Sequence, residues 1–457
     1  MKVPSSIFKA YDIRGIVETE LTPEIVKLIG RAVGSESIKK GERGVVVGRD
    51  GRLSGPELSE ALISGLIESG CHVVNIGMVP SPVVYFATHT KAASSGVMIT
   101  GSHNPAEYNG LKIMIAGETL SAERIQDLYS RILESDFSNG HGTSTSINID
   151  QDYIDTIKSD IKLEKELKVV IDCGNGVAGS IAPKLFEALG VKVSKLFCLV
   201  DGRFPNHHPD PSKPENLEDL IQEVIETDAD LGLAFDGDGD RLGVVDNLGN
   251  IVWADQYMLI LCSEISKLYN NPKVIMDVKC SKIFFDEAKK MGCDPIMSKT
   301  GHSPIKEKMK ELKSPLSGEM SGHVCYGDDF YGYDDAMYVA LRLLRILSNS
   351  KNKLSDMINE FPKTFSTPET RFDVEEIKKF QIIDDIKKRL SSFDGNLIDI
   401  DGIRLENNYG WFLMRASNTQ NQLTCRAEST SEQGLRKLVN VIEDQLKLSN
   451  IDFKFTI

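Results

Sequence analysis

A strand, a glycine-containing loop, a helix, a terminating glycine and a second strand follow one another three times along the chain. The three copies span residues 44–76, 167–193 and 273–297. In the first copy, leucines recur at helical spacing and Gly70 ends the helix. A helix between two strands is the usual crossover between parallel strands of one sheet. The pattern therefore predicts three related α/β domains with mixed sheets.

The last part of the chain follows a different plan. Short strands alternate there with two helices, near residues 375–390 and 432–446, which predicts an α+β domain. A chain of 457 residues is too long for one hydrophobic core. Linkers are expected in the polar or glycine-containing stretches 138–143, 247–250 and 365–368. We therefore expect α/β domains over residues 1–148, 149–250 and 251–365, and the α+β domain over 366–457.

The composition is typical of a globular enzyme, with 41% apolar and 26% charged residues. The net charge of −14 argues against a nucleic-acid-binding surface. No apolar run is long enough to cross a bilayer, and the first residues lack the plan of a signal peptide. The eight cysteines are scattered without a C-x-x-C pair, which indicates reduced thiols. We expect a cytoplasmic protein with no nucleic-acid, membrane or obligate protein partner.

A serine follows the apolar run Gly96–Ile99, in the segment Thr100–Pro105. The run predicts a buried strand that ends just before Ser102. Asn104 cannot start a helix at once, because proline disfavours the α region for the residue before it. Ser102 is therefore expected in an irregular loop, where reactive groups are common. Taken alone, the segment fits a structural turn equally well.

Three aspartates alternate with glycines in Asp236–Arg241, directly after the predicted strand Leu231–Phe235. Alternate positions bring the carboxylates close together, and the glycines let the backbone fold tightly around one ion. Hard oxygen ligands of this kind are typical of a Mg²⁺ site with positions left open for phosphate. A calcium loop begins in the same way, but it needs glycine at Arg241 and a bidentate glutamate at Asn247. We therefore expect a divalent-cation site rather than an acidic surface turn.

The segment Gly174–Gly179 matches G-x-G-x-x-G between a strand and a helix, the context of a dinucleotide-binding turn. No clear acidic residue closes the returning strand Val191–Val193, as that fingerprint requires. Glycine-rich turns also occur in ordinary βαβ units. We interpret the segment as a structural turn and keep a dinucleotide-dependent oxidoreductase as a rival function.

Three later loops carry groups suited to a sugar phosphate. Thr300–Ser303 and Gly318–His323 follow apolar segments, and the second offers a carboxylate, a hydroxyl and an imidazole for sugar hydroxyls. Arg415–Thr419 offers a guanidinium, short hydrogen-bonding side chains and a turn of backbone N–H groups, which suits a phosphate. A surface turn is the alternative for this last segment.

Four of these motifs, in this order, resemble the α-D-phosphohexomutase family, and most closely its bacterial phosphomannomutase/phosphoglucomutase group. They are Thr100–Pro105, Asp236–Arg241, Gly318–His323 and Arg415–Thr419, and the resemblance covers the whole chain. Further matches are Tyr11, Arg14, Lys112, Lys279 and His302. That family has four domains around one deep cleft, so the resemblance implies the same arrangement here.

The resemblance also implies a role for each motif: phosphoserine, Mg²⁺ site, sugar contacts and phosphate site, in chain order. The implied metal ligands are Ser102, Asp236, Asp238 and Asp240. The implied substrate contacts are Tyr11, Lys279, His302, Glu319, Met320, Ser321, Gly322, His323, Arg415, Ala416, Ser417, Asn418 and Thr419. The implied catalytic residues are Ser102, Arg14, Lys112, Arg241, His302 and His323.

The implied reaction moves phosphate between C1 and C6 of a hexose. Phosphorylated Ser102 gives its phosphoryl group to a hexose phosphate, a hexose 1,6-bisphosphate forms and turns round, and the other phosphate returns to Ser102. The attacking hydroxyl must lose a proton. The candidates for that transfer, which the sequence does not rank, are Lys112, Arg14, His302 and His323. Because the intermediate turns round, we expect the C-terminal domain to open and close on a hinge near residues 366–368.

The sequence leaves alternatives for the identity of the sugar and for the class of function. Met320, between Glu319 and Ser321, is more typical of the mannose/glucose group than of the glucosamine group, so phosphoglucosamine mutase is the alternative activity. A serine hydrolase is disfavoured, because Ser102 does not lie in G-x-S-x-G. A non-catalytic sugar-phosphate-binding protein would have no need of Ser102 together with three aspartates.

Overall fold

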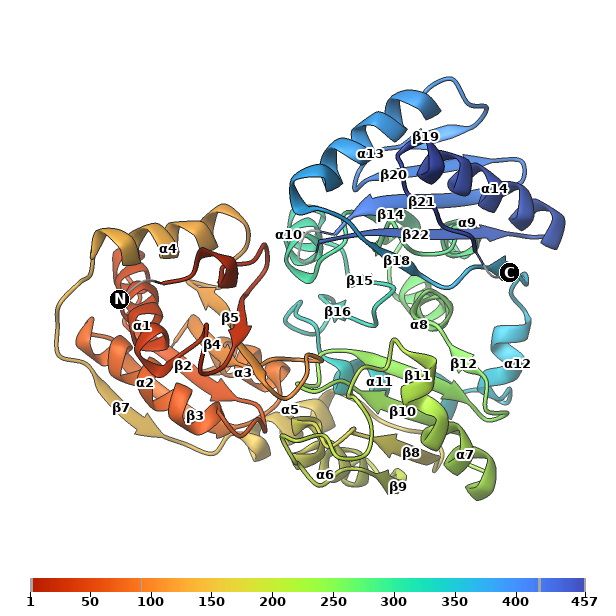
Figure 1. The fold of residues 1–457 in the computed structure, drawn as a ribbon. Coiled ribbons are helices and arrows are strands. Elements are labelled where there is room, and N and C mark those ends of the chain that lie inside the picture. The colour runs from red at the N-terminus through yellow and green to blue at the C-terminus, as the bar shows by residue number, and fades with distance from the viewer. Residues whose placement is uncertain (1–2, 92, 418–420, 456–457) are drawn as a thin grey trace.

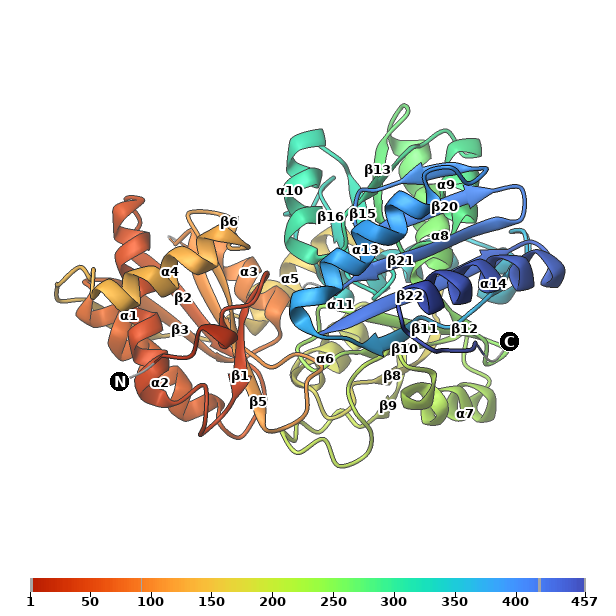
Figure 2. The ribbon, with the colours of Figure 1, turned by 45° about the horizontal axis from the view of Figure 1, so that its top comes forward.

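The computed structural model describes residues 3–91, 93–417 and 421–455, and these residues form four β-sheets with flanking helices (Figure 1). In Figure 1 the first sheet lies at the left, the second at the bottom and the fourth at the top right. The view in Figure 2 keeps the first sheet and its helices on one side of the other three. No helix within the described ranges has both the length and the apolar character needed to cross a membrane.

The first sheet has seven strands in the order β1-β5-β4-β2-β3-β7, with β6 paired to β5. Its strands are β1 Ile13–Ile16, β2 Gly44–Arg49, β3 His72–Met78, β4 Ser95–Ile99, β5 Tyr108–Ile115, β6 Glu118–Thr119 and β7 Thr143–Ser146. Its helices are α1 Pro23–Lys39, α2 Gly55–Glu68, α3 Ser81–Thr90 and α4 Glu123–Glu134.

The second and third sheets are smaller, with strand orders β12-β11-β10-β8-β9 and β14-β13-β15-β16. The second unit contains α5 Asp150–Asp160, β8 Lys168–Asp172, α6 Ala182–Ala188, β9 Lys192–Leu196, α7 Glu218–Thr227, β10 Leu231–Phe235, β11 Leu242–Asp246 and β12 Ile251–Val252. The third contains α8 Ala254–Leu268, β13 Lys273–Asp277, α9 Lys282–Lys290, β14 Asp294–Ser298, α10 His302–Leu312, β15 Leu316–Gly318, β16 Val324–Tyr326, α11 Ala336–Ser348 and α12 Leu354–Asn359.

The fourth sheet is antiparallel throughout, with the order β17-β22-β21-β20-β19 and β18 paired to β22. Its elements are β17 Phe365–Ser366, β18 Thr370–Asp373, α13 Glu376–Leu390, β19 Asn396–Ile398, β20 Ile403–Asn407, β21 Gly410–Ala416, β22 Gln422–Ser429 and α14 Glu432–Leu448. Residues of α13 and α14 share one apolar core with β20, β21 and β22. Three α/β units followed by an α+β unit confirm the predicted fold class.

The first three units share one strand plan. In each, two parallel pairs are followed by an antiparallel hairpin: β3-β2-β4-β5, β9-β8-β10-β11 and β14-β13-β15-β16. The hairpin loops are residues 100–107, 236–241 and 319–323, which we call the serine loop, the aspartate loop and the glutamate loop. Three of the motifs found in the sequence therefore occupy the same place in three repeats.

Local sequence explains where several helices begin. Thr22 accepts the Ile25 amide at 3.4 Å and precedes a proline, so α1 has a capped start. Ser431 caps α14 through the Gly434 amide at 3.1 Å. The most extensive buried apolar cluster joins the second and third units with α3, so the first three units meet across shared apolar surfaces rather than standing apart.

The structure differs from the sequence-based expectations at sheet edges. Residues 13–16, for which no strand was predicted, form β1, because the neighbouring strand β5 supplies the pairing that four residues cannot encode alone. The predicted linker 138–143 ends where the exposed strand β7 begins. The predicted linker 365–368 begins with β17 and continues with the Thr367 amide donating to Ala427 O at 2.9 Å, so it belongs to the fourth sheet.

Candidate functional site

Ser102 lies in the serine loop, 2% exposed, with its hydroxyl against the second unit. Its Oγ donates to Asp236 Oδ2 at 2.9 Å and lies 3.1 Å from His103 Nδ1. Its amide donates to Thr100 Oγ1 at 2.7 Å. Its φ of 49° is left-handed, a conformation that non-glycine residues adopt only when the surroundings impose it. The loop therefore directs one buried hydroxyl at the aspartate loop.

The three aspartates of the aspartate loop are fully buried, with carboxylate oxygens within 4.8 Å of one another. Asp236 Oδ1 accepts the amides of Asp240 and Arg241, both at 3.1 Å. A Cβ at Gly237 would collide with the Ser102 carbonyl oxygen, so this glycine allows the two loops to touch. The alternation of aspartate and glycine thus builds a compact acidic cluster against Ser102.

Basic groups offset part of this charge. Lys112, 5% exposed on β5, donates to Asp238 Oδ2 at 2.6 Å and also to Asp240. Burial by itself would raise the pKa of Asp238, but Lys112 holds that pKa below its ordinary value. Burial, followed by the charges of Asp238 and Asp240, raises the pKa of Asp236 well above its ordinary value. Arg241 Nε lies 3.9 Å from Asp236 Oδ2 as a second positive charge, and three carboxylates still outnumber these two cations.

The cluster has the donor atoms that a divalent cation requires. Among the described residues, Asp238 Oδ1 and Asp240 Oδ1 are buried and accept no hydrogen bond. Buried carboxylate oxygens without partners are costly unless a cation binds them. Hard oxygen donors of this kind suit Mg²⁺ or a similar ion. The residues present therefore fit a metal site.

The aspartate loop touches the glutamate loop through Arg241. The Arg241 Nε donates to His323 Nε2 at 3.0 Å. The other ring nitrogen, Nδ1, lies 3.0 Å from Asp334 Oδ2, and Lys306 Nζ lies 2.6 Å from Asp334 Oδ1. Sequence reasoning missed Asp334 and Lys306. Lys306 follows His302 by one helical turn of α10, which could have indicated it; Asp334 has no local signal.

Tyr11 and His302 lie where the first unit meets the third. The Tyr11 hydroxyl donates to Thr300 O at 3.1 Å, and its ring occupies the space that a Cβ at Gly301 would need. The rings of His302 and His323 have centroids 5.7 Å apart. Burial, followed by the charge of Lys306, lowers the pKa of His302 well below its ordinary value, so its imidazole is neutral.

The rest of the glutamate loop faces two other loops of the third unit. Glu319 Oε2 accepts the Gly301 amide at 2.9 Å, and the Met320 amide donates to Asp277 Oδ1 at 3.3 Å. Gly322 is buried with a φ of 94°, and Ser321 beside it is partly exposed. Lys279 Nζ lies 3.4 Å from Glu369 Oε2, so the predicted sugar-contacting residues also reach the fourth unit.

Arg14 and Arg415 lie at opposite ends of this set of contacts. Arg14 on β1 donates to Asn104 Oδ1 and to Asp12, which places its guanidinium beside the serine loop. Arg415 at the end of β21 lies 3.1 Å from Asp401 Oδ2. The same oxygen accepts the Thr300 amide at 3.0 Å, so Arg415 is linked to the third unit. Ala416 is buried and Ser417 partly exposed; Asn418 and Thr419 lie outside the described residues.

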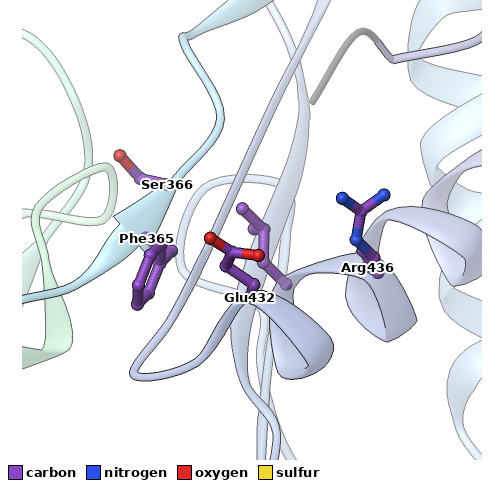
Figure 3. Close-up of a pocket in the computed structure, with 5 residues that line it drawn as sticks. Phe365, Ser366, Glu432 and Arg436 are labelled. Carbon is purple, nitrogen blue, oxygen red and sulfur yellow. The ribbon is translucent and has the colours of Figure 1, made fainter.

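A cavity of about 310 Å³ lies away from these residues (Figure 3). Its walls are Phe365 and Ser366 of β17 with Glu432, Leu435 and Arg436 of α14. Figure 3 shows Glu432 and Arg436 on the helix and Phe365 on the facing strand. None of the predicted site residues lines it, so the candidate site is the set of loops and not this cavity.

Family models match the chain in four successive segments. Those described as phosphoglucomutase/phosphomannomutase alpha/beta/alpha domains I, II and III match residues 5–139, 151–249 and 253–365. The model for the C-terminal domain of the same family matches residues 369–445.

Relatives of known name match over nearly the whole length. The phosphomannomutase/phosphoglucomutase of Pseudomonas aeruginosa is 50% identical over 445 residues, 97% of this chain and 96% of that protein. A phosphoglucomutase of Neisseria meningitidis is 45% identical over 443 residues, 96% of each chain. The crystal structure of a phosphoglucomutase/phosphomannomutase family protein from Burkholderia thailandensis has a TM-score of 0.94 and 42% identity over 98% of each chain. This chain therefore belongs to the phosphoglucomutase/phosphomannomutase family.

Proposed function

We propose that the protein is a phosphohexomutase, an isomerase that interconverts hexose 1-phosphate and hexose 6-phosphate with mannose or glucose as the sugar. The observation that carries this is the 2.9 Å contact between Ser102 Oγ and Asp236 Oδ2, which seats a buried hydroxyl on a cluster of three carboxylates. A serine that carries phosphate beside a metal site needs this juxtaposition. Relatives named phosphomannomutase/phosphoglucomutase and phosphoglucomutase support the same activity.

In the proposed reaction, Ser102 carries a phosphoryl group in the resting enzyme. A hydroxyl oxygen of the hexose phosphate forms a bond to that phosphorus while the bond to Ser102 Oγ breaks. The resulting hexose 1,6-bisphosphate turns round and returns its other phosphoryl group to Ser102. Asp236, Asp238 and Asp240, with an oxygen on Ser102, would hold Mg²⁺, whose charge offsets that of the transferring group.

Basic side chains of the chain itself stabilise the transferring group. Lys112 is within hydrogen-bonding distance of the aspartates, and Arg14 contacts Asn104 in the serine loop. Arg241 follows the last aspartate directly in the chain. Preorganised positive charge at the place where negative charge spreads is the largest catalytic term in most such sites. We assign this role to all three residues.

The proton transfers require a base for the sugar hydroxyl and an acid for the serine oxygen. His323 Nε2 accepts a hydrogen bond from Arg241 Nε, and Nδ1 faces the Asp334 carboxylate. The Nε2 lone pair is thus engaged by the Arg241 guanidinium, so Nε2 could take a proton from the sugar only if that hydrogen bond opens. His302, His323, Lys112 and Arg14 therefore all remain candidates for the base and the acid.

Substrate binding is assigned to the third and fourth units. Glu319, with the other residues of the glutamate loop, would accept and donate hydrogen bonds to sugar hydroxyls, and Tyr11, Lys279 and His302 would line the same side. Arg415 and the segment 416–419 would bind the phosphate that is not reacting. Binding energy from that remote phosphate orients the reacting end.

A dinucleotide-dependent oxidoreductase remains the weaker alternative. The glycine turn it would use is occupied by protein, since Val177 N donates to Gly237 O at 3.1 Å and a Cβ at Gly176 would lie 2.9 Å from that oxygen. This supports a structural turn that carries the aspartate loop. Phosphoglucosamine mutase is the second sugar alternative, and the names of the relatives favour mannose and glucose over it.

Two further expectations belong to the proposal. The sequence predicts domain boundaries at residues 148/149, 250/251 and 365/366; we keep the first, and we place the second after β12, which pairs with β11, and the third before β17, which pairs with β22. We also place the protein in the cytoplasm, which the eight cysteines, all free thiols in the structure, support. No nucleic acid, membrane or protein partner takes part in the proposed reaction.

The proposal is tested by the intact mass and activity of Ser102→Ala. The parent protein should carry one phosphoryl group and convert mannose and glucose 1-phosphates in the presence of the matching bisphosphate, whereas Ser102→Ala should lose both properties. Ser159→Ala, on the exposed side of α5, is the matched control and should keep both. An active alanine variant of unchanged mass would exclude Ser102 as the phosphate carrier. Full activity in the presence of a chelator would remove the metal from the proposal.

A further inference from the structure

Arg52 is a fully buried arginine beside the serine loop that sequence reasoning assigned to no role. It lies in the loop between β2 and α2, and its side chain is 0% exposed. Burial makes direct contact with a substrate impossible. Its guanidinium must therefore serve other parts of the protein.

All the carbonyl groups bound by this guanidinium lie in or directly after the serine loop. Nη1 donates to Pro105 O at 2.6 Å and to Tyr108 O at 2.9 Å. Nη2 donates to Ser102 O at 2.8 Å and to Asn104 O at 2.6 Å. One planar group thus gathers four main-chain carbonyls of one short segment, among which Pro105 O also accepts the Tyr108 amide at 3.1 Å.

Asp50 binds both the Arg52 guanidinium and the start of the serine loop. Its Oδ2 accepts Arg52 Nε and the Gly101 amide, both at 3.2 Å. Its Oδ1 accepts the Arg52 amide at 2.9 Å. A Cβ at Gly101 would collide with the guanidinium, so the glycine in this motif is the residue that lets the arginine approach.

The peptide of Ser102 is held from two sides. Arg52 binds its carbonyl oxygen from within the first unit, and Gly237 of the aspartate loop packs against the same oxygen. Ser102 keeps its left-handed φ of 49° between these contacts. A strained residue persists only where its neighbours determine the conformation, and here they do.

The second unit covers Arg52 on its remaining side. The ring of Phe204 has its centroid 5.1 Å from the guanidinium carbon. A Cβ at Gly202 would lie 2.7 Å from Arg52 Cα, so this segment packs directly on the arginine backbone. The arginine is therefore enclosed between the serine loop and a segment of the neighbouring unit.

We propose that Arg52 is a positioning residue for phosphoryl transfer: its four carbonyl contacts, closed over by Phe204, hold Ser102 in the left-handed conformation that directs Oγ at the aspartate loop. The inference rests on the proposed role of Ser102 as the phosphate carrier. Lysine cannot replace the arginine, because three donors on one atom cannot reach four carbonyls and Asp50 together. A misplacement of about 1 Å at a reacting atom costs about a hundredfold in rate.

The test compares Arg52→Lys with Arg342→Lys. Arg342 is also a buried arginine, with Glu264 and Asp328 as partners at 2.8 Å, but it lies in α11 and contacts no part of the serine loop. Arg52→Lys should lower kcat about a hundredfold with KM changed less than about twofold, and amide hydrogens of residues 100–108 should exchange faster. Arg342→Lys should lose thermal stability while kcat per folded molecule and exchange at 100–108 stay those of the parent.

The outcomes separate this inference from the proposed function. A kcat within about twofold of the parent in Arg52→Lys, with unchanged exchange at 100–108, overturns the positioning role. If Arg52→Lys does not fold, Phe204→Leu decides: faster exchange at 100–108 with a lower kcat supports the inference, and parental values of both overturn it. A parent protein without phosphate on Ser102 would contradict the proposed function instead, and the exchange measurement would still report whether Arg52 holds the loop.

Discussion

The serine loop and Arg415 are the two ends of the proposed site, and they are held in different ways. The serine loop is fixed by buried contacts from two units: Arg52 binds its carbonyls, and Asp236 receives the Ser102 hydroxyl. Arg415 is held by Asp401, on its own unit, and Asp401 in turn accepts one amide from the third unit.

This difference indicates which kinetic property, turnover or substrate affinity, each end of the proposed site controls. A reacting hydroxyl needs a fixed direction, and many short buried contacts give it one. In the proposed function, Arg415 binds the remote phosphate of a substrate that must turn round, so it needs charge at the right place. Asp401 is the one carboxylate paired with Arg415 among the residues that the structure describes, which leaves the guanidinium able to change partners. Changes at the serine end should therefore alter turnover, and changes at the Arg415 end should alter affinity.

The largest effect is expected at the serine end, from Lys112→Met. The variant removes the buried ammonium next to the aspartates, so kcat should fall by about 10²–10³-fold at saturating Mg²⁺ while KM changes little. Steady-state kinetics on glucose 1-phosphate measure both. Lys308→Met, on the outer face of α10 in a pair with Glu311, is the control and should behave as the parent. An unaltered kcat in Lys112→Met would contradict the charge role of this residue.

At the opposite end, Arg415→Gln should raise KM for the hexose phosphate by about 10–100-fold, because a hydrogen bond between charged groups is lost. The reduction in kcat should be smaller, since Arg415 does not face the reacting hydroxyl in the proposed complex. Saturation kinetics with both sugar phosphates give the two constants. A variant with parental KM and a strongly reduced kcat would reverse the assignment of the two ends.

Asp401→Asn is a weaker change at the same end. The amide oxygen can still accept the Thr300 amide, but the charge that holds Arg415 is gone, so KM should rise only about three- to tenfold. Asp399→Asn is matched to it, because Asp399 is exposed and pairs with Lys387 on the outside of the same unit. Equal effects of the two substitutions would show that Asp401 has no special role.

The smallest effect on activity is expected at a carboxylate at neither end, where the change concerns stability instead. Burial raises the pKa of Asp335, which caps α11, from an ordinary 3.8 to about 7. The folded protein therefore keeps a proton that the unfolded chain releases, and this contribution to stability, full below the ordinary pKa, is lost as pH rises through 7. Asp335→Asn should weaken the decline of the unfolding free energy between pH 5 and pH 8, by about 1.4 kcal/mol for each pH unit below 7. Urea unfolding at the two pH values measures this, and an unchanged decline would contradict it.

Much of the fold could be predicted because its signals are local. Each repeat carries apolar residues at helical spacing and a glycine that ends the helix. The segment Asp236–Arg241 follows a strand that is recognisable from its own run of apolar residues. The strands β1 and β7 could not be predicted in the same way. They are short edge strands, and their pairing is provided by β5 and β3 rather than by their own residues.

The residues of the candidate site likewise fall into those that local sequence signals indicated and those that only the fold brings together. Ser102, the aspartates and Lys112 lie together, as the motifs and the family resemblance indicated. The contacts of Arg52 could not be foreseen, since main-chain carbonyls 50 to 56 residues away have no signature in the sequence. Asp334 and Asp401 are single carboxylates among 67 acidic residues, and only the folded structure distinguishes them.

The shared place of the serine, aspartate and glutamate loops has a consequence for how such a chain can change. In each repeat, strand pairing requires only that a loop connect the last two strands. The sequence of that loop can therefore vary without changing the sheet. In the proposed function, one loop carries the phosphate, another holds the metal ion and the third binds the sugar, while the strand pairing beneath them is the same in all three units. Loops with different roles can act on one substrate only if the three units place them in contact. The hydrogen bonds from Ser102 to Asp236 and from Arg241 to His323 are those contacts.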